Sequence, residues 1–204
     1  MRVSRVTIAN FRGISSATIL LPNHVVLIGD NNTGKTTILE AIDLALGPDR
    51  LNRTPPIDEH DFFRGKYIAT SLGPPAEGIQ TTANGEIAGA TTIAEESNPQ
   101  PAEGEAPRIE IEVTIVDLTS EQKGRFGDYT EFWNKEADTF YAEPDPAGID
   151  AANITEALRI TFHGWYDREE DDFQGRTYFT RSLSEGPTPS IFSRTHKLGF
   201  GGFG

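Results

Sequence analysis

The chain has 204 residues, no cysteine and a formal net charge of −13 at pH 7. The lack of cysteine excludes a disulfide framework and a cysteine-ligated zinc site, and no stretch reaches about 18 consecutive apolar residues, so we expect a cytoplasmic protein without a membrane span. The charge argues against a basic nucleic-acid-binding surface, although residues 1–67 are nearly neutral, with eight basic and seven acidic side chains.

Three strands are predicted before the first helix. Residues 3–8 open an extended segment, residues 10–13 (Asn-Phe-Arg-Gly) break it, and residues 14–21 resume it. A Pro-Asn turn leads into an apolar run at residues 24–28 (His-Val-Val-Leu-Ile). We predict that this run is the strand that feeds the following loop.

Residues 29–36 (GDNNTGKT) match every fixed position of the phosphate-binding pattern G-x-x-x-x-G-K-[ST]. The two glycines let backbone N–H groups converge on an anion, and the helix that follows directs its positive end at the same place. Lys35 is expected to contact the β- and γ-phosphates of ATP, the Thr36 hydroxyl to ligate Mg²⁺, and Thr37 to lie nearer the α-phosphate. The predicted nucleotide-binding residues are Gly29, Asp30, Asn31, Asn32, Thr33, Gly34, Lys35, Thr36 and Thr37.

The next segments divide the chain further. Residues 36–46 have apolar side chains at helical spacing, and Gly47 with Pro48 should end this helix, which we expect to be buried against the sheet. Residues 68–107 contain six glutamates and no lysine or arginine, and they show no sustained periodicity, so we expect a flexible acidic insertion. These patterns divide the whole chain into three predicted units: an ATP-binding lobe (1–67), the insertion (68–107) and a strand-rich continuation (108–204).

The continuation begins with a strand at residues 109–115, whose apolar and polar residues alternate, so we expect one face to be exposed to water. Thr119 and Gln122 predict a capping box at the start of a short helix. Residues 158–166 and 175–181 are predicted to form a hairpin, and the acidic run between them to be a solvated turn rather than a metal site.

The opening sequence resembles the N-terminal lobe of ABC-type ATPases of the RecF and SMC kind. In that lobe a turn like residues 10–13 lies between two strands, ahead of a phosphate loop that contains asparagine, here Asn31 and Asn32. The resemblance implies an α/β fold: a P-loop NTPase with an ABC-ATPase-like mixed sheet and an additional antiparallel strand-rich region. It also implies that Arg12 lies near the nucleotide, the alternative being an arginine on a surface turn.

Within that group, residues 55–63 (PPIDEHDFF) and 109–118 (IEIEVTIVDL) are similar to segments of OLD-family ATP-dependent endonucleases. This resemblance implies that two lobes form a homodimer around ATP, and that a Toprim domain beyond this chain cleaves DNA. Nothing in the sequence corresponds to the Toprim acidic residues, and the Gly-Phe-rich end suggests a truncated chain. His60 could be mechanistic, although a surface histidine is the alternative.

Other classes of nucleotide-binding protein have further sequence requirements. A GTPase is disfavoured because residues 134–137 (Asn-Lys-Glu-Ala) lack the aspartate of a guanine-binding motif. Asp117 is the best candidate for the acidic residue that follows a Walker B strand, but Leu118 occupies the place of the glutamate. Residues 183–186 match an ABC signature segment only by chance. The remaining hypotheses are a RecF/SMC-like DNA repair or condensation ATPase without a nuclease, and a remnant that folds poorly.

Overall fold

The structure is a computed structural model that describes residues 1–30, 34–47, 54–68, 106–141, 143 and 148–185. Nearly all of the predicted insertion, three phosphate-loop residues and the Gly-Phe-rich end therefore lie outside the described residues. The three loop residues are Asn31, Asn32 and Thr33.

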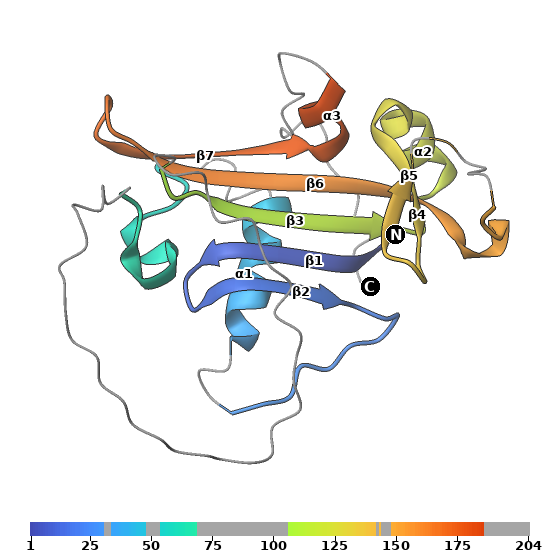
Figure 1. The fold of residues 1–204 in the computed structure, drawn as a ribbon, viewed down its shortest axis with the longest axis horizontal. Helices are drawn as coiled ribbons and strands as arrows, with labels where there is room; N and C mark the ends of the chain where they lie inside the picture. The colour runs from blue at the N-terminus through green and yellow to red at the C-terminus, as the bar shows by residue number, and fades with distance from the viewer. Residues whose placement is uncertain (31–33, 48–53, 69–105, 142, 144–147, 186–204) are drawn as a thin grey trace, which may run out of the picture.

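A seven-stranded antiparallel sheet forms the body of the described chain (Figure 1). Its order is β2-β1-β3-β6-β4-β5, and β7 pairs with β6. The long strand β6 pairs with β3 along one side, while β4 and β7 share its other side. The strands are β1 (Arg2–Phe11), β2 (Ile14–Leu20), β3 (Ile109–Val116), β4 (Thr130–Asn134), β5 (Thr139–Tyr141), β6 (Ile154–Asp167) and β7 (Asp172–Phe179).

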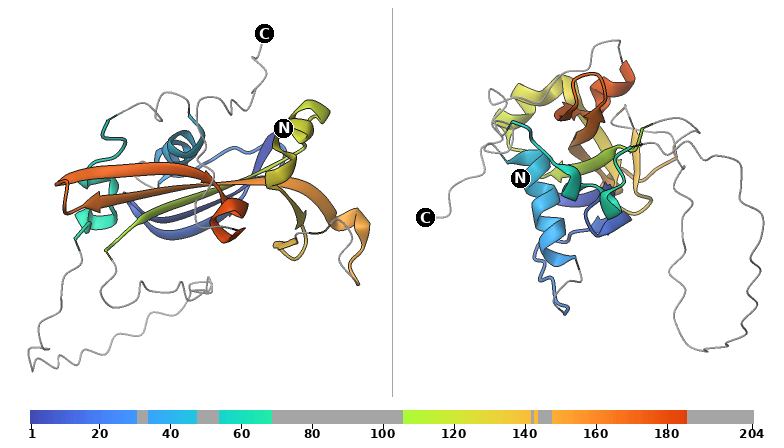
Figure 2. Two further views of the ribbon diagram at one scale, coloured as in Figure 1. Left: turned by 90° about the horizontal axis from the view of Figure 1, so that it is seen from above. Right: turned by 90° about the vertical axis from the view of Figure 1, so that its left-hand side faces the viewer.

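Helix α1 (Lys35–Leu46) packs on one face of this sheet, as Figure 2 shows. On the other face, Phe140 of the β4–β5 hairpin packs with Val116, Trp133 and Ala157. The side chains of α1 that face the sheet are Ala41, Leu44 and Ala45, and they meet alternate apolar residues of β1, β3 and β6. The helical spacing at residues 36–46 thus predicted the helix correctly. The expected burial holds only for part of the apolar face, because the side chain of Leu39 is 59% exposed.

The remaining helices are short. They are α2 (Ser120–Phe126), α3 (Thr180–Glu185) and the 3-10 turns η2 (Glu59–Asp61), η3 (Phe63–Gly65), η4 (Gly127–Tyr129) and η5 (Ala151–Asn153). The predicted capping box at α2 is confirmed, because Thr119 and Gln122 exchange side-chain and backbone hydrogen bonds. The predicted hairpin is the β6–β7 pair, and the Asp167 carboxylate accepts backbone N–H bonds within its acidic turn.

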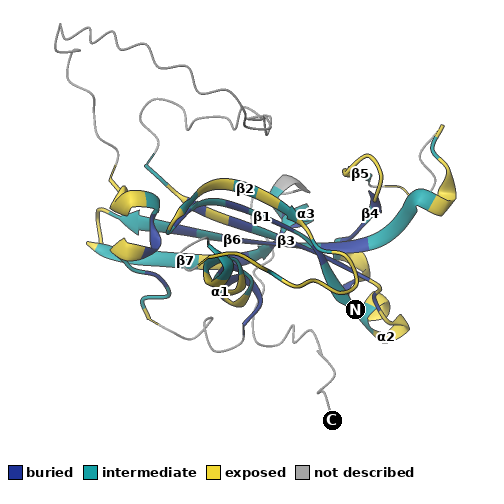
Figure 3. Ribbon diagram, turned by 90° about the horizontal axis from the view of Figure 1, so that it is seen from below, coloured by how far each residue is buried: buried dark blue, intermediate teal, exposed yellow. Residues whose placement is uncertain are grey.

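The predicted strand at residues 24–28 is wrong for the described structure. These residues form no ladder with any described strand, and the side chains of Val26 and Ile28 are 81% and 90% exposed. An apolar run becomes a strand only when a neighbouring strand satisfies its backbone groups and covers its side chains. Figure 3 shows this segment mostly in the colour of exposed residues, on the path of the chain from the end of β2 to α1.

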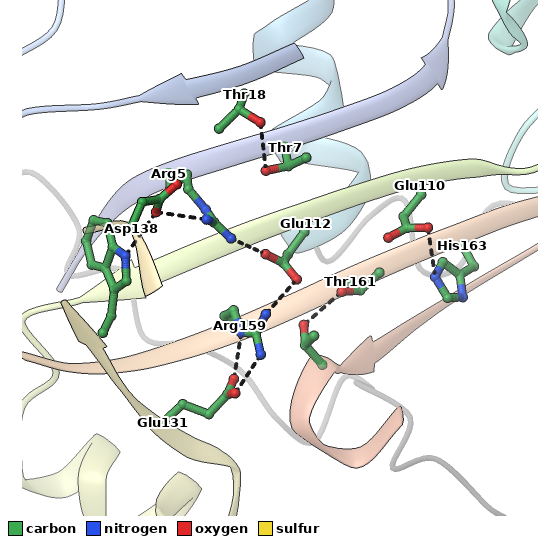
Figure 4. Close-up of polar contacts among 12 residues, drawn as sticks. Arg5, Thr7, Thr18, Glu110, Glu112, Glu131, Asp138, Arg159, Thr161 and His163 are labelled. Carbon is green, nitrogen blue, oxygen red and sulfur yellow. Dashed lines mark hydrogen bonds and ion pairs between the residues drawn. The ribbon is translucent and has the colours of Figure 1, made fainter. Parts of the chain in front are cut away.

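Strand β3 is also more buried than its alternation suggested. It lies between β1 and β6, and Thr114 on its polar face is fully buried. The polar face is covered by side chains from other strands: the Arg159 guanidinium on β6 bonds to Glu131 on β4 at 2.6 and 2.7 Å and to Glu112 on β3 at 3.2 Å (Figure 4). The expected exposed face is therefore present at Glu110 but not at Glu112 and Thr114, because charged residues, once paired, can cover a sheet face.

Phe140 completes this cover. Two guanidinium groups contact its ring, with the Arg159 Cζ 4.0 Å and the Arg5 Cζ 4.9 Å from the ring centroid. Arg5 also bonds to Glu112 at 2.6 Å and to Asp138 at 2.8 Å. The network therefore crosses β1, β3, β6 and β4 and holds the β4–β5 hairpin on the sheet.

A pair of glycines lets residues 55–57 cross the β6–β7 pair. Gly164 and Gly175 are cross-strand partners, and a Cβ on Gly175 would lie 2.7 Å from Phe162 Cζ and 2.8 Å from Pro56 Cγ. We expect Gly175→Ala to lower the free energy of unfolding by about 1–3 kcal/mol, because the added methyl group overpacks this crossing. Urea denaturation measures the change. Gly124→Ala on α2 is the control, since no atom lies within 4 Å of its Cβ, and a destabilisation no larger than that of the control would contradict the prediction.

His163 on β6 makes the fold sensitive to acid. Burial, and then the charge of Arg108, lower its pKa from 6.5 to about 4. Glu110, 3.8 Å away, acts in the opposite direction, but its side chain is 57% exposed, so solvent screens it. The unfolded chain takes up the proton near pH 6.5, so this contribution to stability is complete above pH 6.5 and is lost as the pH falls towards 4.

We therefore expect His163→Gln to remove part of the acid sensitivity. At pH 4 the loss from His163 reaches about 3 kcal/mol, because each tenfold change in proton affinity is worth about 1.4 kcal/mol. Urea unfolding of parent and variant at pH 7, 5.5 and 4 tests this. Parallel pH profiles for the two proteins would show that His163 titrates normally in the folded state.

Candidate functional site

The described part of the phosphate loop leads directly into α1. Gly34 has φ +84°, a left-handed conformation that favours glycine, and it precedes the first helical residue. The first turn of α1 carries no acidic side chain and receives no side-chain cap from Gly34. No side chain of the first turn therefore neutralises the positive end of the helix, and an anion site requires this.

Lys35 folds back over the loop. Its Nζ atom donates hydrogen bonds to the carbonyl oxygens of Gly29 at 2.6 Å and of Asp30 at 2.5 Å. Thr36 follows with an exposed side chain, and Thr37 is half-buried. The lysine amine and a threonine hydroxyl therefore lie together at the helix start, beside the loop backbone.

The β1–β2 turn abuts this loop. A Cβ on Gly34 would lie 4.0 Å from Ile14 Cδ1, and Ile14 is the first residue of β2. Two residues earlier, the Arg12 side chain forms an ion pair with Glu40 on α1. Glu40 lies one helical turn beyond Thr36, roughly 6 Å along the axis. The turn and the start of α1 are therefore packed against each other.

Arg12 is held from a third element as well. Its Nε donates to Asp61 Oδ1 at 2.8 Å, and its backbone N–H donates to the Asp61 carbonyl at 2.8 Å. Burial tends to lower the pKa of Arg12, but hydrogen bonds to Asp61 and Glu40 outweigh it, so the pKa is raised and the guanidinium stays charged. The arginine thus joins the β1–β2 turn, α1 and η2.

Asp61 and Glu40 were not predicted as site residues. Asp61 is buried inside an acidic segment whose composition alone indicated solvent exposure. The pattern Asp58-x-x-Asp61 does form a capping box, with the Asp58 N–H donating to Asp61 Oδ2 at 3.1 Å. This spacing of two aspartates could have predicted an ordered turn from the sequence. It could not have predicted that Arg12 is the partner of Asp61.

An open pocket of about 460 Å³ adjoins Arg12, and Asp58, His60, Phe62 and Arg64 are among its lining residues. His60 lies at its rim with the side chain 86% exposed, 3.7 Å from Glu59. The structure therefore places His60 at the surface, near Arg12 but without a buried partner.

Other predicted residues lie elsewhere. Asp117 follows the end of β3 that pairs with Arg2, and it forms a 2.9 Å ion pair with Arg2. The β1–β2 turn with Arg12 is at the opposite end of β1, so the register does not bring Asp117 to the β1–β2 turn. The Asn134 side chain accepts two backbone N–H bonds in the β4–β5 turn. This structural role explains an asparagine at this position without guanine binding.

No described helix is long and apolar enough to cross a membrane. Within the described ranges, no group of three or more histidine or carboxylate side chains could hold a metal ion. Residues 183–185 belong to the six-residue helix α3, while Gly186 lies outside the described residues.

Two curated proteins resemble short parts of the chain. The uncharacterized protein YbjD of Escherichia coli K12 is 43% identical over 49 residues, which are 24% of this chain and 9% of YbjD. The DNA replication and repair protein RecF of Mesorhizobium japonicum is 44% identical over 57 residues, which are 28% of this chain and 15% of RecF. The matched segments thus span a small fraction of either relative.

A solved chain from work on the "structural biochemistry of ATP-driven dimerization and DNA stimulated activation of SMC ATPases" is similar with a TM-score of 0.39 and 11% identity. The match covers 96% of this chain and 75% of that one. The family AAA_15, an AAA ATPase domain, matches residues 1–135. These residues include the phosphate loop, α1 and the strands β1, β2 and β3. Because the match spans 135 of the 204 residues, the chain belongs to this family of AAA ATPase domains.

Proposed function

We propose that this chain is the ATP-binding N-terminal portion of an OLD-like ATP-dependent DNA endonuclease, in which nucleotide binding and hydrolysis regulate DNA processing. The observation that carries the nucleotide part is the phosphate loop at the uncapped start of α1, with Lys35 folded over it. The endonuclease part rests on the similarity of residues 55–63 and 109–118 to OLD-family segments.

Magnesium-ATP fits the residues at this site. The Lys35 amine already bonds to the carbonyl oxygens of Gly29 and Asp30, and a phosphate chain can take over its N–H donors. The exposed Thr36 hydroxyl would hold Mg²⁺, and Thr37 would lie nearer the α-phosphate. Mg²⁺ supplies charge neutralisation between the β- and γ-phosphates when it is bound. The loop residues Asn31, Asn32 and Thr33 complete this proposed site.

In the whole protein, we propose that two such lobes form a homodimer around ATP and that DNA is bound by parts outside this chain. The division into an ATP-binding lobe (1–67), an insertion (68–107) and a strand-rich continuation (108–204) belongs to the same proposal. Asp117 remains a weak candidate for hydrolysis, since its carboxylate is paired with Arg2. Little ATP turnover is expected from this chain alone.

The second candidate is a RecF/SMC-like DNA repair ATPase without a nuclease. The 44% identity over 57 residues to RecF, a protein named for DNA replication and repair, favours it. Reading the gene beyond the codon of Gly204 separates the candidates. A Toprim acidic triad would support the OLD-like protein, and heptad repeats with an ABC signature helix would support the RecF/SMC-like one.

Calorimetry with magnesium-ATP tests the nucleotide function of the chain itself. We expect saturable binding with one site per chain, and DNA incubated with the protein should stay intact. Absence of binding at millimolar ATP would overturn the proposed nucleotide site. Cleavage of DNA that is abolished by substituting a residue of this chain would refute the claim that the nuclease lies elsewhere.

A further inference from the structure

We propose that Asp61 is the residue that positions Arg12 at the phosphate loop, and that Glu40 is an exchangeable partner which a nucleotide phosphate replaces. The proposal rests on the proposed binding of nucleotide by the loop. It adds two residues that lie outside the phosphate-loop motif, one on the second turn of α1 and one in η2.

The position of Arg12 comes from two independent contacts. Gly34 of the loop packs against Ile14, and Glu40 of α1 pairs with Arg12, so the turn touches both the loop and its helix. Arg12 itself has φ +48°, a left-handed conformation that is uncommon for a residue with a side chain. Such strain is tolerated where the surrounding structure enforces it, and it is found often at functional sites.

Asp61 is the fixed partner. Its side chain is only 6% exposed, and both carboxylate oxygens are used, Oδ1 by Arg12 Nε and Oδ2 by the Asp58 N–H. The Asp61 carbonyl also accepts the Arg12 N–H, and the next residue, Phe62, bridges to Phe11 of β1. Breaking this pair would leave a buried carboxylate without its counter-charge and its Oδ1 atom without a donor, so Arg12 stays attached to it.

Glu40 is the replaceable partner. It reaches Arg12 through a single contact to Nη1, and its side chain is 31% exposed. Ion pairs that face solvent contribute little, whereas phosphate carries more charge and matches the guanidinium fork with two parallel hydrogen bonds. Nucleotide can therefore draw the outer end of the guanidinium away from Glu40, while Nε remains on Asp61.

Nucleotide affinity measured in a set of variants tests this division of roles. We expect Asp61→Asn to weaken magnesium-ATP binding about tenfold, because it loosens an arginine that makes a charge-assisted contact. In an Arg12→Ala background the same substitution should have no effect on affinity, whereas a purely structural role of Asp61 would weaken binding in both backgrounds.

Glu40→Gln should act in the opposite direction and tighten binding about two- to fivefold, since it removes the competitor for Arg12. Asp43→Asn, on the same helix one turn further from the loop, controls for the loss of one negative charge. Equal tightening by both substitutions would overturn the exchange. Glu40→Gln also keeps the test open if Asp61→Asn does not fold.

The outcomes separate this inference from the proposed function. If the parent chain does not bind magnesium-ATP, the nucleotide site itself is wrong. If the parent binds and Lys35→Ala does not, but Asp61→Asn and Glu40→Gln leave affinity unchanged, the nucleotide site stands and the roles of Asp61 and Glu40 are refuted.

Discussion

Replacing Lys35 by alanine is expected to weaken magnesium-ATP binding at least about 100-fold, equivalent to about 2.7 kcal/mol. The Lys35 amine is the cationic side chain on the described loop backbone, where it now bonds to two carbonyl oxygens. Its removal takes away the point charge that offsets the β- and γ-phosphates, and alanine offers no other donor. Isothermal titration calorimetry with magnesium-ATP measures the effect directly.

The control for this prediction is Lys135→Ala, which removes the same charge from the exposed β4–β5 turn on the other face of the sheet. Binding by this variant should equal that of the parent. If Lys35→Ala kept its affinity within a few-fold of the parent, residues 29–36 would not form a phosphate-binding loop.

The second large effect is expected at Arg159, where substitution by alanine should lower the free energy of unfolding by about 3 kcal/mol. Arg159 donates both bonds that hold Glu131, a carboxylate with a side chain only 10% exposed. Burial tends to lower the pKa of Arg159, but the hydrogen bonds and charges of Glu131 and Glu112 raise it, so it remains cationic. Alanine would leave a buried carboxylate unpaired and would uncover Phe140.

Guanidinium chloride unfolding, followed by tryptophan fluorescence, measures this loss. Glu131→Gln in the Arg159→Ala background should recover part of the stability, because it removes the unpaired charge. If the double variant were no more stable than Arg159→Ala, the destabilisation would come from lost packing on Phe140 rather than from the carboxylate.

Local sequence patterns predicted most of the elements. The period of the apolar residues placed α1, the alternation at residues 109–115 placed β3, and the box at Thr119 and Gln122 placed the start of α2. These features depend on residues close together in the sequence, so propensity and periodicity capture them.

The features that sequence reasoning missed depend on residues far apart. Arg12 and Asp61 are 49 residues apart, and Glu131 and Arg159 are 28 apart, and no local pattern pairs them. The run at residues 24–28 failed for the converse reason: it has the composition of a strand, but the described residues provide no strand to pair with it. Pairing across a sheet, and the cover of a polar face by paired charges, are properties of the whole fold.

The unpaired run at residues 24–28 has a thermodynamic consequence for the nucleotide. Gly29 follows this run directly, and its carbonyl accepts a bond from Lys35, so the order of the run and the geometry of the loop are coupled. Suppose that a polypeptide strand pairs with residues 24–28 and thereby raises the affinity of the loop for ATP. By linkage, ATP then raises the affinity for that strand by the same factor.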